Sequence, residues 1–402
     1  MLIVKKFGGT SVADKERIYN VAKRCIEDYK KGNDVVVVLS AMGKMTDVLI
    51  EQAKEINPNP SKREMDMLLT TGEQTSVALM AMAMNNLGVP AVSLNAFQVA
   101  MNTNSNYGNA RLKRIDSERI RNELSNRKIV VVTGFQGINK FEDYTTLGRG
   151  GSDTTAVALA AALNADACEI YTDVDGVYTA DPRVVKTARK LDAITYDEML
   201  ELATLGAGVL HNRSVEMAKK YGVQLVVRSS LNLSEGTVVK EDVGMEKMLV
   251  SGVACDRNTA RIAVIGLEDQ PGVAFKLFNH LARYNINVDI ILQSVGRDGT
   301  KDISFTVAED VVDEAVEILE RHRQTSLKCE SISVEKNVAK VSVVGAGMMS
   351  NAGVAAKMFE ALYDVGVNIK MISTSEIRVT VLINDSDVDQ AMNSVHDKFI
   401  HD

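Results

Sequence analysis

The sequence has few cysteines, histidines and prolines. Its four cysteines lie far apart and form no C-x-x-C pair, which argues against a disulfide scaffold and, with only five histidines, against a zinc site. Five prolines in 402 residues, with 46% hydrophobic residues, exclude a collagen-like or disordered chain. The length suggests about two to four domains. The cysteines, expected to be buried thiols, are Cys25, Cys168, Cys255 and Cys329.

Long apolar runs are also missing. The longest, Val77–Met84 and Ala156–Leu163, fall well short of the roughly 18–20 residues that a membrane span needs, so no membrane partner is expected. Acidic residues outnumber basic ones by 53 to 46, which argues against a nucleic-acid partner. The opening MLIVKK is too short for a signal peptide, and we expect a cytoplasmic location.

The first half of the chain alternates short β-rich runs with helical patterns. Asp34–Ser40 contains four consecutive valines, as is typical of a strand buried on both faces. This alternation predicts an α/β domain over residues 1–231, with a mostly parallel sheet between layers of helices. The other expected strands are Leu2–Lys6, Pro90–Leu94, Ile129–Thr133, Cys168–Thr172 and Val223–Arg228, and the expected helices include Ala13–Lys31, Ser61–Leu87, Ser152–Leu163 and Thr195–Tyr221.

The second half contains an internal repeat after a polar stretch. Residues 232–247 are polar and charged with two glycines, and we interpret them as a linker. Two copies of a strand-turn-helix-strand pattern follow, at about 262–336 and 340–402. Each reads as a ferredoxin-like βαββαβ module. An extra strand at 248–255 is expected to complete the second module, so that the two modules of domain 248–402 interlock.

A first glycine-rich motif, KFGGTS, follows the first expected strand and opens a helix. Gly8 and Gly9 have no Cβ atom, so their backbone can approach a phosphate closely. Lys6 adds a mobile positive charge. Spacing alone leaves open whether the motif binds phosphate or only forms a tight turn.

A second glycine-rich motif, LGRGGSDTT, also opens a helix. Arg149 can hold a carboxylate or a phosphate with two parallel hydrogen bonds. Asp153 stands at the helix start, where it either serves the site or simply caps the helix. Two such helix starts in one α/β domain favour an anion-binding function.

Two further stretches carry candidate polar groups. TDVDGVYTADPR follows the strand Cys168–Thr172, where such folds hold bases and metal ions, although a solvated acidic turn remains the alternative. In TTGEQTS, Glu73 either favours a helix dipole or binds a substrate ammonium. The run SAMGKMT, from Ser40, offers hydroxyl groups. His211 is interpreted as a packed helix residue.

Taken together, these motifs resemble the aspartokinase family in content and order. The repeat resembles paired ACT regulatory modules, and DQPG at Asp269–Gly272 matches their D-x-P-G turn. The resemblance implies an amino-acid kinase fold followed by two ACT modules. It implies transfer of the γ-phosphoryl group of ATP, with Mg²⁺, to the side-chain carboxylate of L-aspartate. The product, 4-phospho-L-aspartate, opens the lysine, threonine and methionine branch of amino-acid biosynthesis.

The resemblance also assigns residues. The implied catalytic residues are Lys6 and Asp153, and no separate protein metal site is expected. The implied nucleotide-binding residues are Lys6, Gly8, Gly9, Thr10, Ser40, Thr172, Asp173, Tyr178, Asp181 and Arg183. The implied substrate-binding residues are Thr46, Glu73, Arg149, Gly150, Gly151 and Ser152. Many relatives carry a lysine that contacts the nucleotide where this chain has Gly208.

For regulation, the resemblance implies feedback by lysine, threonine or both. The implied effector-binding residues are Asp269, Gly272, Ala274, Gln293, Asn368 and Ile369. It further implies a homodimer or larger assembly and, through an internal start at Met245 or Met248, a separate small regulatory subunit. The alternatives are a kinase of the same fold that acts on glutamate or acetylglutamate, and a non-catalytic amino-acid sensor.

Overall fold

The computed structural model describes residues 1–206, 208–242, 249–295 and 299–400 and divides into two units. The first comprises Met1–Tyr178, Lys190–Thr204 and Gly208–Met245, and the second comprises Thr179–Arg189, Leu205–Ala207 and Glu246–Asp402. Among the described residues, no helix combines the length and the apolar character needed to cross a bilayer.

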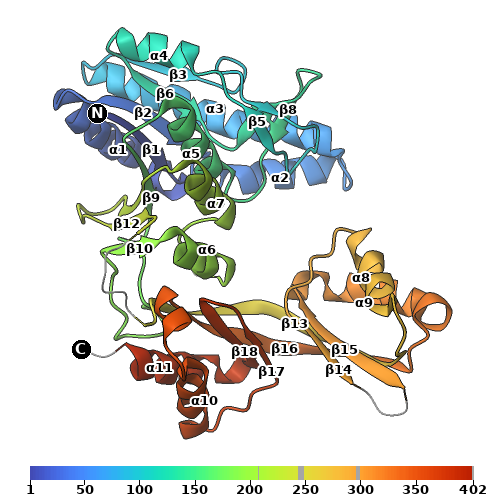
Figure 1. Cartoon of the computed structure of the whole chain (residues 1–402). Coiled ribbons are helices and arrows are strands. Elements are labelled where there is room, and N and C mark those ends of the chain that lie inside the picture. The colour runs from blue at the N-terminus through green and yellow to red at the C-terminus, as the bar shows by residue number, and fades with distance from the viewer. Residues whose placement is uncertain (207, 243–248, 296–298, 401–402) are drawn as a thin grey trace. The chain divides into compact units, whose positions relative to one another are not determined.

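The first unit is built on an eight-stranded sheet in the order β10-β12-β11-β9-β1-β2-β6-β3 (Figure 1). All neighbouring pairs run parallel except β11 and β12. The mostly parallel sheet predicted from the sequence is therefore confirmed. Its strands are β1 (Leu2–Phe7), β2 (Asp34–Leu39), β3 (Ala91–Leu94), β6 (Ile129–Thr133), β9 (Ala167–Thr172), β10 (Ala193–Thr195), β11 (Leu225–Ser229) and β12 (Thr237–Lys240).

Helices cover both faces of this sheet. Helices α1 (Lys15–Lys30) and α3 (Lys62–Asn86) bury their apolar side chains against alternate strand residues, such as Val35 and Val37. Helix α5 (Gly151–Leu163), rich in alanine, packs on β1, β2 and β9. A helix on each side explains why strand β2 reads as a continuous valine run, since both of its faces are buried. The remaining helices are α2 (Met45–Ile56), α4 (Glu118–Ser125), α6 (Tyr196–Thr204) and α7 (Asn212–Tyr221).

Two expectations for this unit were wrong, and one small sheet was missed. The single helix expected over Thr195–Tyr221 is two helices, because Gly206 and Gly208 adopt φ values of +90° and +66° between them. The expected linker 232–247 contains strand β12, and its residues 243–247 lie outside the described part. A four-stranded sheet, β5-β4-β7-β8, was not expected at all, since its strands are two or three residues long. These strands are β4 (Asn102–Thr103), β5 (Leu112–Arg114), β7 (Gln136–Ile138) and β8 (Tyr144–Thr146).

The second unit holds two βαββαβ modules that share one antiparallel sheet, in the order β14-β15-β13-β16-β18-β17. The first module carries α8 (Val273–Ala282) and α9 (Val312–His322), and the second carries α10 (Val354–Asp364) and α11 (Val388–Phe399). The strands are β13 (Gly252–Glu268), β14 (Ile291–Val295), β15 (Thr300–Val307), β16 (Ser331–Val344), β17 (Met371–Thr374) and β18 (Arg378–Asn384).

Strands β13 and β16 each run through both modules. The amino-terminal part of β13 pairs with the carboxyl-terminal part of β16, from Gly252↔Val344 to Asp256↔Lys340, and after a register shift the pairing continues in the first module. Both strands therefore cross boundaries predicted from the sequence, β13 the one between 255 and 262 and β16 the one between 336 and 340. Neither Val253–Ile265 nor β16 contains a glycine or a proline, so each strand continues through the irregular pairing between Asp256 and Arg261.

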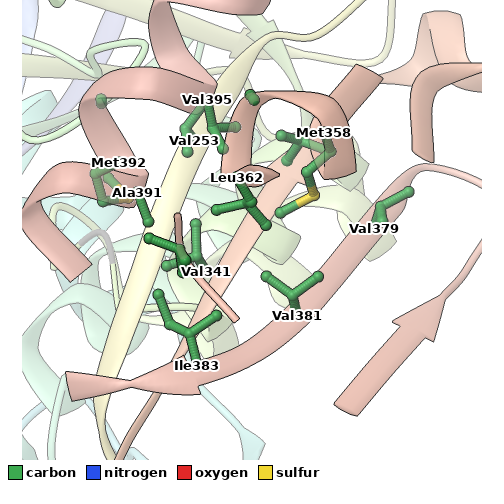
Figure 2. Close-up of a cluster of buried hydrophobic side chains, with 14 of the residues drawn as sticks. Val253, Val341, Met358, Leu362, Val379, Val381, Ile383, Ala391, Met392 and Val395 are labelled. Carbon is green, nitrogen blue, oxygen red and sulfur yellow. The ribbon is translucent and has the colours of Figure 1, made fainter. Parts of the chain in front are cut away.

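The core of the second module also includes residues from a distant part of the chain. Figure 2 shows this core, with side chains from β13, β16 and β18 and from helices α10 and α11. Ala180 and Val185, from the segment Thr179–Arg189, are buried in the same cluster. Val253 N–H donates to Thr179 O at 2.7 Å. This segment directly follows the acidic loop of the first unit in sequence, yet it folds as part of the second.

His396 on α11 fixes that segment. Its side chain is fully buried, with Nε2 2.9 Å from Thr179 Oγ1 and Nδ1 3.4 Å from Thr187 Oγ1. Burial lowers the pKa of His396 below its ordinary value, with Arg189 acting in the same direction and Asp397 against it.

We therefore expect the second module to lose stability in mild acid. A histidine whose folded pKa is depressed binds more protons when unfolded, so its contribution is complete above about pH 6.5 and falls as the pH drops below that value. Hydrogen exchange of the α11 amides, corrected for intrinsic rates, should be several-fold less protected at pH 5.5 than at pH 7.5. His396→Gln should remove this difference, and an equal difference in the variant would contradict the assignment.

Candidate functional site

A cavity of about 290 Å³ in the first unit gathers most of the residues singled out from the motifs. It lies where β1 and β2 end and α5 begins, at the carboxyl edge of the parallel strands, where α/β folds bind their ligands. Its lining includes the predicted residues Lys6, Gly9, Ser40, Thr46, Glu73, Arg149, Gly150, Gly151, Ser152 and Asp153. Four separate motifs thus contribute to one cavity.

Lys6 and Asp153 form an ion pair on one side of the cavity. Lys6 Nζ lies 2.6 Å from Asp153 Oδ1, and each side chain is 13% exposed. Asp153 stands in the first turn of α5, whose N-cap is Gly150, so the capping interpretation of Asp153 was wrong. A mostly buried ammonium held by one carboxylate retains donors that can face an anionic ligand.

The neighbouring Lys5 has a different environment. Side chains alternate along a strand, so Lys5 points to the α1 face of the sheet while Lys6 points to the α5 face. Lys5 Nζ lies 2.6 Å from Asp28 Oδ2 and 2.8 Å from Glu169 Oε2, and its side chain is 1% exposed. Lys5 therefore belongs to the buried interior and Lys6 to the cavity.

The glycine-rich turn after β1 is close-packed. A Cβ atom on Gly9 would lie 2.6 Å from Ala41 O and 3.0 Å from Gly43 O, both main-chain atoms that cannot easily move. Ser40 Oγ lies 3.0 Å from Ser152 Oγ and links the loop after β2 to the start of α5. Backbone amides, hydroxyls and the Lys6 ammonium thus line the same wall, a donor set suited to phosphate oxygens.

Glu73 contributes a buried carboxyl group to the same cavity. It lies in the middle of α3, far from the helix start, so the interpretation that it favours the helix dipole was wrong. Its side chain lines the cavity, while the residue is only 3% exposed. Its Oε1 accepts from Ala41 N–H at 3.2 Å, whereas Oε2 has no hydrogen-bond partner among the described residues.

This environment disfavours the charged form of Glu73. Burial raises the pKa of Glu73 to about 8, and the hydrogen bond from Ala41 N–H opposes that rise only in part. A cationic ligand group beside Oε2 would supply the missing partner and restore the carboxylate. Glu73 is therefore suited to bind an ammonium.

The close approach of α3 to the Ala41 loop depends on Gly72. A Cβ atom there would lie 2.8 Å from Ala41 Cβ. We expect Gly72→Ala to destabilise the first unit by about 1–3 kcal/mol and to weaken binding at Glu73, because overpacking pushes α3 away from that loop. Urea unfolding and substrate titration measure both effects. The double variant Gly72→Ala/Ala41→Gly, which removes the opposing methyl group, should recover most of the loss, and no recovery would contradict the steric explanation.

Other predicted nucleotide residues lie outside this cavity lining. Gly8 caps the short 3-10 helix η1 (Gly9–Val12), and Thr10 is exposed. In the acidic loop, Thr172 Oγ1 lies 2.9 Å from Asp173 Oδ1, and Tyr178 OH donates to Asp175 at 2.8 Å. The last two, Asp181 and Arg183, pair at 2.7 Å within the second unit.

The predicted effector residues are divided between the two modules. Gly272 is the N-cap of α8 with φ +91°, Ala274 is the second residue of that helix, and Asp269 Oδ1 pairs with Lys301 Nζ at 2.6 Å. Gln293 is exposed on the edge strand β14. In the second module, Asn368 is exposed and Ile369 packs against the core. These six assignments stay predictions.

Sequence reasoning missed groups that support the cavity. Asp66, about two turns before Glu73 in α3, is 1% exposed and accepts hydrogen bonds from Gly108 N–H and from the amide and hydroxyl of Thr146. It thereby fixes the strand that leads into the RGGSD loop. Phe135, with φ +68°, lines the cavity, and no pattern in the sequence marks it.

Comparisons with known proteins agree with this geometry. Residues 1–229 match the Amino acid kinase family, and residues 262–322 and 341–399 match the ACT domain. The chain is 54% identical to the aspartokinase of Bacillus sp. (strain MGA3) over 399 residues, covering 99% of this chain and 97% of the relative. It is 52% identical to aspartokinase 2 of Bacillus subtilis, with the same coverage.

Solved structures give the same result. Aspartokinase III of E. coli in complex with aspartate and ADP (R-state) superposes with a TM-score of 0.84 at 27% identity, covering all of both chains. The complex of that enzyme with lysine and aspartate (T-state) gives 0.77 at 28% identity, again with full coverage. The family predicted from the motifs is confirmed: the chain belongs to the aspartokinases.

Proposed function

We propose that this chain transfers the γ-phosphoryl group of ATP to the side-chain carboxylate of L-aspartate and forms 4-phospho-L-aspartate. The observation that carries the proposal is the unpartnered Glu73 oxygen in the same cavity as Lys6 and Arg149. In one cavity, Glu73 can accept hydrogen bonds from an ammonium, Arg149 can bind a carboxylate, and Lys6 with the backbone amides can donate to phosphate oxygens. The aspartate and ADP held by E. coli aspartokinase III support this substrate pair.

The chemistry requires little beyond positioning. A side-chain carboxylate is already ionised at neutral pH, so it can attack the γ-phosphorus without a general base. Glu73 and Arg149 would hold the ammonium and the α-carboxylate of the substrate, with Thr46 beside them. Lys6, oriented by Asp153, would neutralise charge on the transferring group, and Ser40 and Gly9 would line the phosphates.

The cavity offers one carboxylate, Asp153, that could hold the Mg²⁺ ion of Mg-ATP. No group of three or more His, Cys, Asp or Glu side chains suited to a metal occurs in the described part of the chain. Mg²⁺ commonly binds through one or two carboxylates together with substrate phosphates and water. Asp153 would be the carboxylate that holds it, and the ion would neutralise phosphate charge. The outer nucleotide contacts would come from Gly8, Thr10, Thr172, Asp173, Tyr178, Asp181 and Arg183.

The paired modules are proposed to sense the end products. We propose that lysine, threonine or both bind at the predicted effector residues and inhibit turnover, in a homodimer or larger assembly. The lysine complex of E. coli aspartokinase III supports an amino-acid effector. A small subunit from an internal start remains a prediction, because Met245 and Met248 lie outside the described residues. A cytoplasmic location, where ATP and free aspartate meet, completes the proposal.

Coupled ADP release from Mg-ATP tests this function. Turnover should require L-aspartate, should be absent with L-glutamate or N-acetyl-L-glutamate, and should fall when lysine, threonine or both are added. Aspartate-dependent turnover without inhibition would leave the kinase in place and refute the proposed effectors. Effector binding without any turnover on aspartate would favour a sensor.

A further inference from the structure

A second cavity in the first unit adjoins the first one. Its volume is about 590 Å³, and it shares Gly148 and Arg149 with the 290 Å³ cavity. Its other walls come from the loop before β5, the carboxyl-terminal part of α6 and the beginning of α7. None of the proposed substrate or phosphate contacts except Arg149 and its glycine loop requires this space.

The wall of this second cavity carries an excess of positive charge. Arg111, Arg149 and Arg213 line it, and Glu216 is the one acidic side chain in the described lining. Across the described ranges, none of the three guanidinium groups forms an ion pair. Arg213 donates to Leu147 O and Ala110 O, each at 2.8 Å. These neutral acceptors fix its position without neutralising its charge, which Glu216 offsets only in part.

The charges also act on one another. Burial, followed by the charge of Arg111, lowers the pKa of Arg213 to about 10. Burial also lowers the pKa of His211. The positive charges of Arg213, Arg149 and Arg111 act in the same direction as burial, and Asp153 acts against them. An anion in the cavity would relieve this repulsion. The first amides of α7, a ten-residue helix, add to the positive potential there.

We propose that this cavity is a second anion subsite, which takes a small dianion bearing phosphate or carboxylate groups between Arg111 and Arg213. Planar guanidinium groups bind both kinds of oxygen through paired hydrogen bonds, so the two ligand classes share one recognition chemistry. Because Arg149 lines both cavities, a dianion in the second competes for the guanidinium that would hold the substrate carboxylate. Occupancy therefore weakens aspartate binding without blocking the first cavity.

Calorimetric titration of the full chain with inorganic phosphate and with succinate, at constant ionic strength and without nucleotide, tests the subsite. Arg111→Gln should weaken binding of the probe by about tenfold, as expected for one charge-assisted contact. Lys113→Gln removes the same charge from an exposed residue outside the cavity lining. It should change the affinity for the probe less than twofold. Glu216→Gln should strengthen binding, since it removes the acid of the wall.

The same probes should raise the KM for aspartate in the wild type towards a plateau, because the effect is partial. Arg111→Gln should keep its basal kcat and KM within about twofold and lose the response to the probe. If phosphate binds and succinate does not, or the reverse, the ligand class is assigned. The proposal is overturned if neither probe binds below about 10 mM, or if Arg111→Gln and Lys113→Gln bind them equally. Binding without nucleotide does not depend on turnover, so failure here is distinct from failure of the kinase assignment.

Discussion

Replacing Lys6 with methionine is expected to lower kcat by about 10²- to 10³-fold, the usual cost of removing one preorganised donor from a developing charge. Lys6 Nζ is held 2.6 Å from Asp153 on the cavity wall, and its side chain is mostly buried. Methionine has a similar length and fills the same space without the charge. Steady-state ADP release with saturating Mg-ATP and aspartate measures the effect. Because the change also takes from Asp153 its ion-pair partner, the thermal midpoint is measured alongside and the rate is expressed per folded protein.

Lys5→Met provides a matched control one residue away. It removes the same charge from the same strand, but Lys5 is buried between Asp28 and Glu169 on the other face of the sheet. Its loss removes the buried cation that Asp28 and Glu169 share and leaves them only the more exposed Lys31 and Arg228 as charged partners. We therefore expect a cost of about 3 kcal/mol in unfolding free energy, with kcat of the folded fraction largely kept. A Lys6→Met protein that folds and turns over at a near-normal rate would refute the role of Lys6.

Replacing Glu73 with glutamine is expected to weaken aspartate binding by about 10- to 100-fold, the range for losing a hydrogen bond to a charged group. Glutamine keeps the shape of the side chain and can still accept from Ala41 N–H, but it cannot neutralise an ammonium. The Kd for aspartate, measured by calorimetry, should rise, while nucleotide binding should stay within about twofold. Equal losses for both ligands would indicate a collapsed cavity instead.

The raised pKa of Glu73, about 8, adds a pH dependence with a defined sign. Below pH 8 the ligand-free carboxyl group is mainly protonated, and binding an ammonium must release that proton. Aspartate should therefore bind more tightly as the pH rises from 6 to 8, by up to about tenfold per unit, and level off above. Calorimetry at pH 7 in buffers of different ionisation enthalpy should detect the released proton. Glu73→Gln should abolish both the slope and the release.

The sequence predicted much of this site because its chemistry is concentrated in short local motifs. Two glycine-rich helix starts gave Lys6, Gly9, Arg149 and Asp153, and the structure brings all four to one cavity. Such motifs can be recognised in a sequence because an anion-binding site needs glycines, a cationic side chain and a helix start close together in the chain. The role of Glu73 was harder to predict, because a carboxylate in a helix can serve several purposes. Only its burial in the folded chain distinguishes a ligand-binding role from the others.

Local sequence patterns could not predict features that depend on contacts between residues far apart in the chain. Thr179–Arg189 looks like the continuation of a loop, yet Ala180 and Val185 complete the core of the second module. Asp66 is one acidic residue among 53 until the fold brings Gly108 and Thr146 to it. The continuous strands β13 and β16 could have been predicted, because their shared stretch contains no glycine or proline, although the irregular pairing between Asp256 and Arg261 could not.

Trapping the product with hydroxylamine tests the central claim, phosphorylation of the aspartate side chain, most directly. An acyl phosphate reacts with hydroxylamine to give a hydroxamate, whose position mass spectrometry can assign. With Mg-ATP and L-aspartate, the wild-type chain should form the side-chain hydroxamate of aspartate at the rate of ADP release, and Lys6→Met should form almost none. ADP release without that hydroxamate, or with a hydroxamate at the α-carboxyl group, would contradict the account.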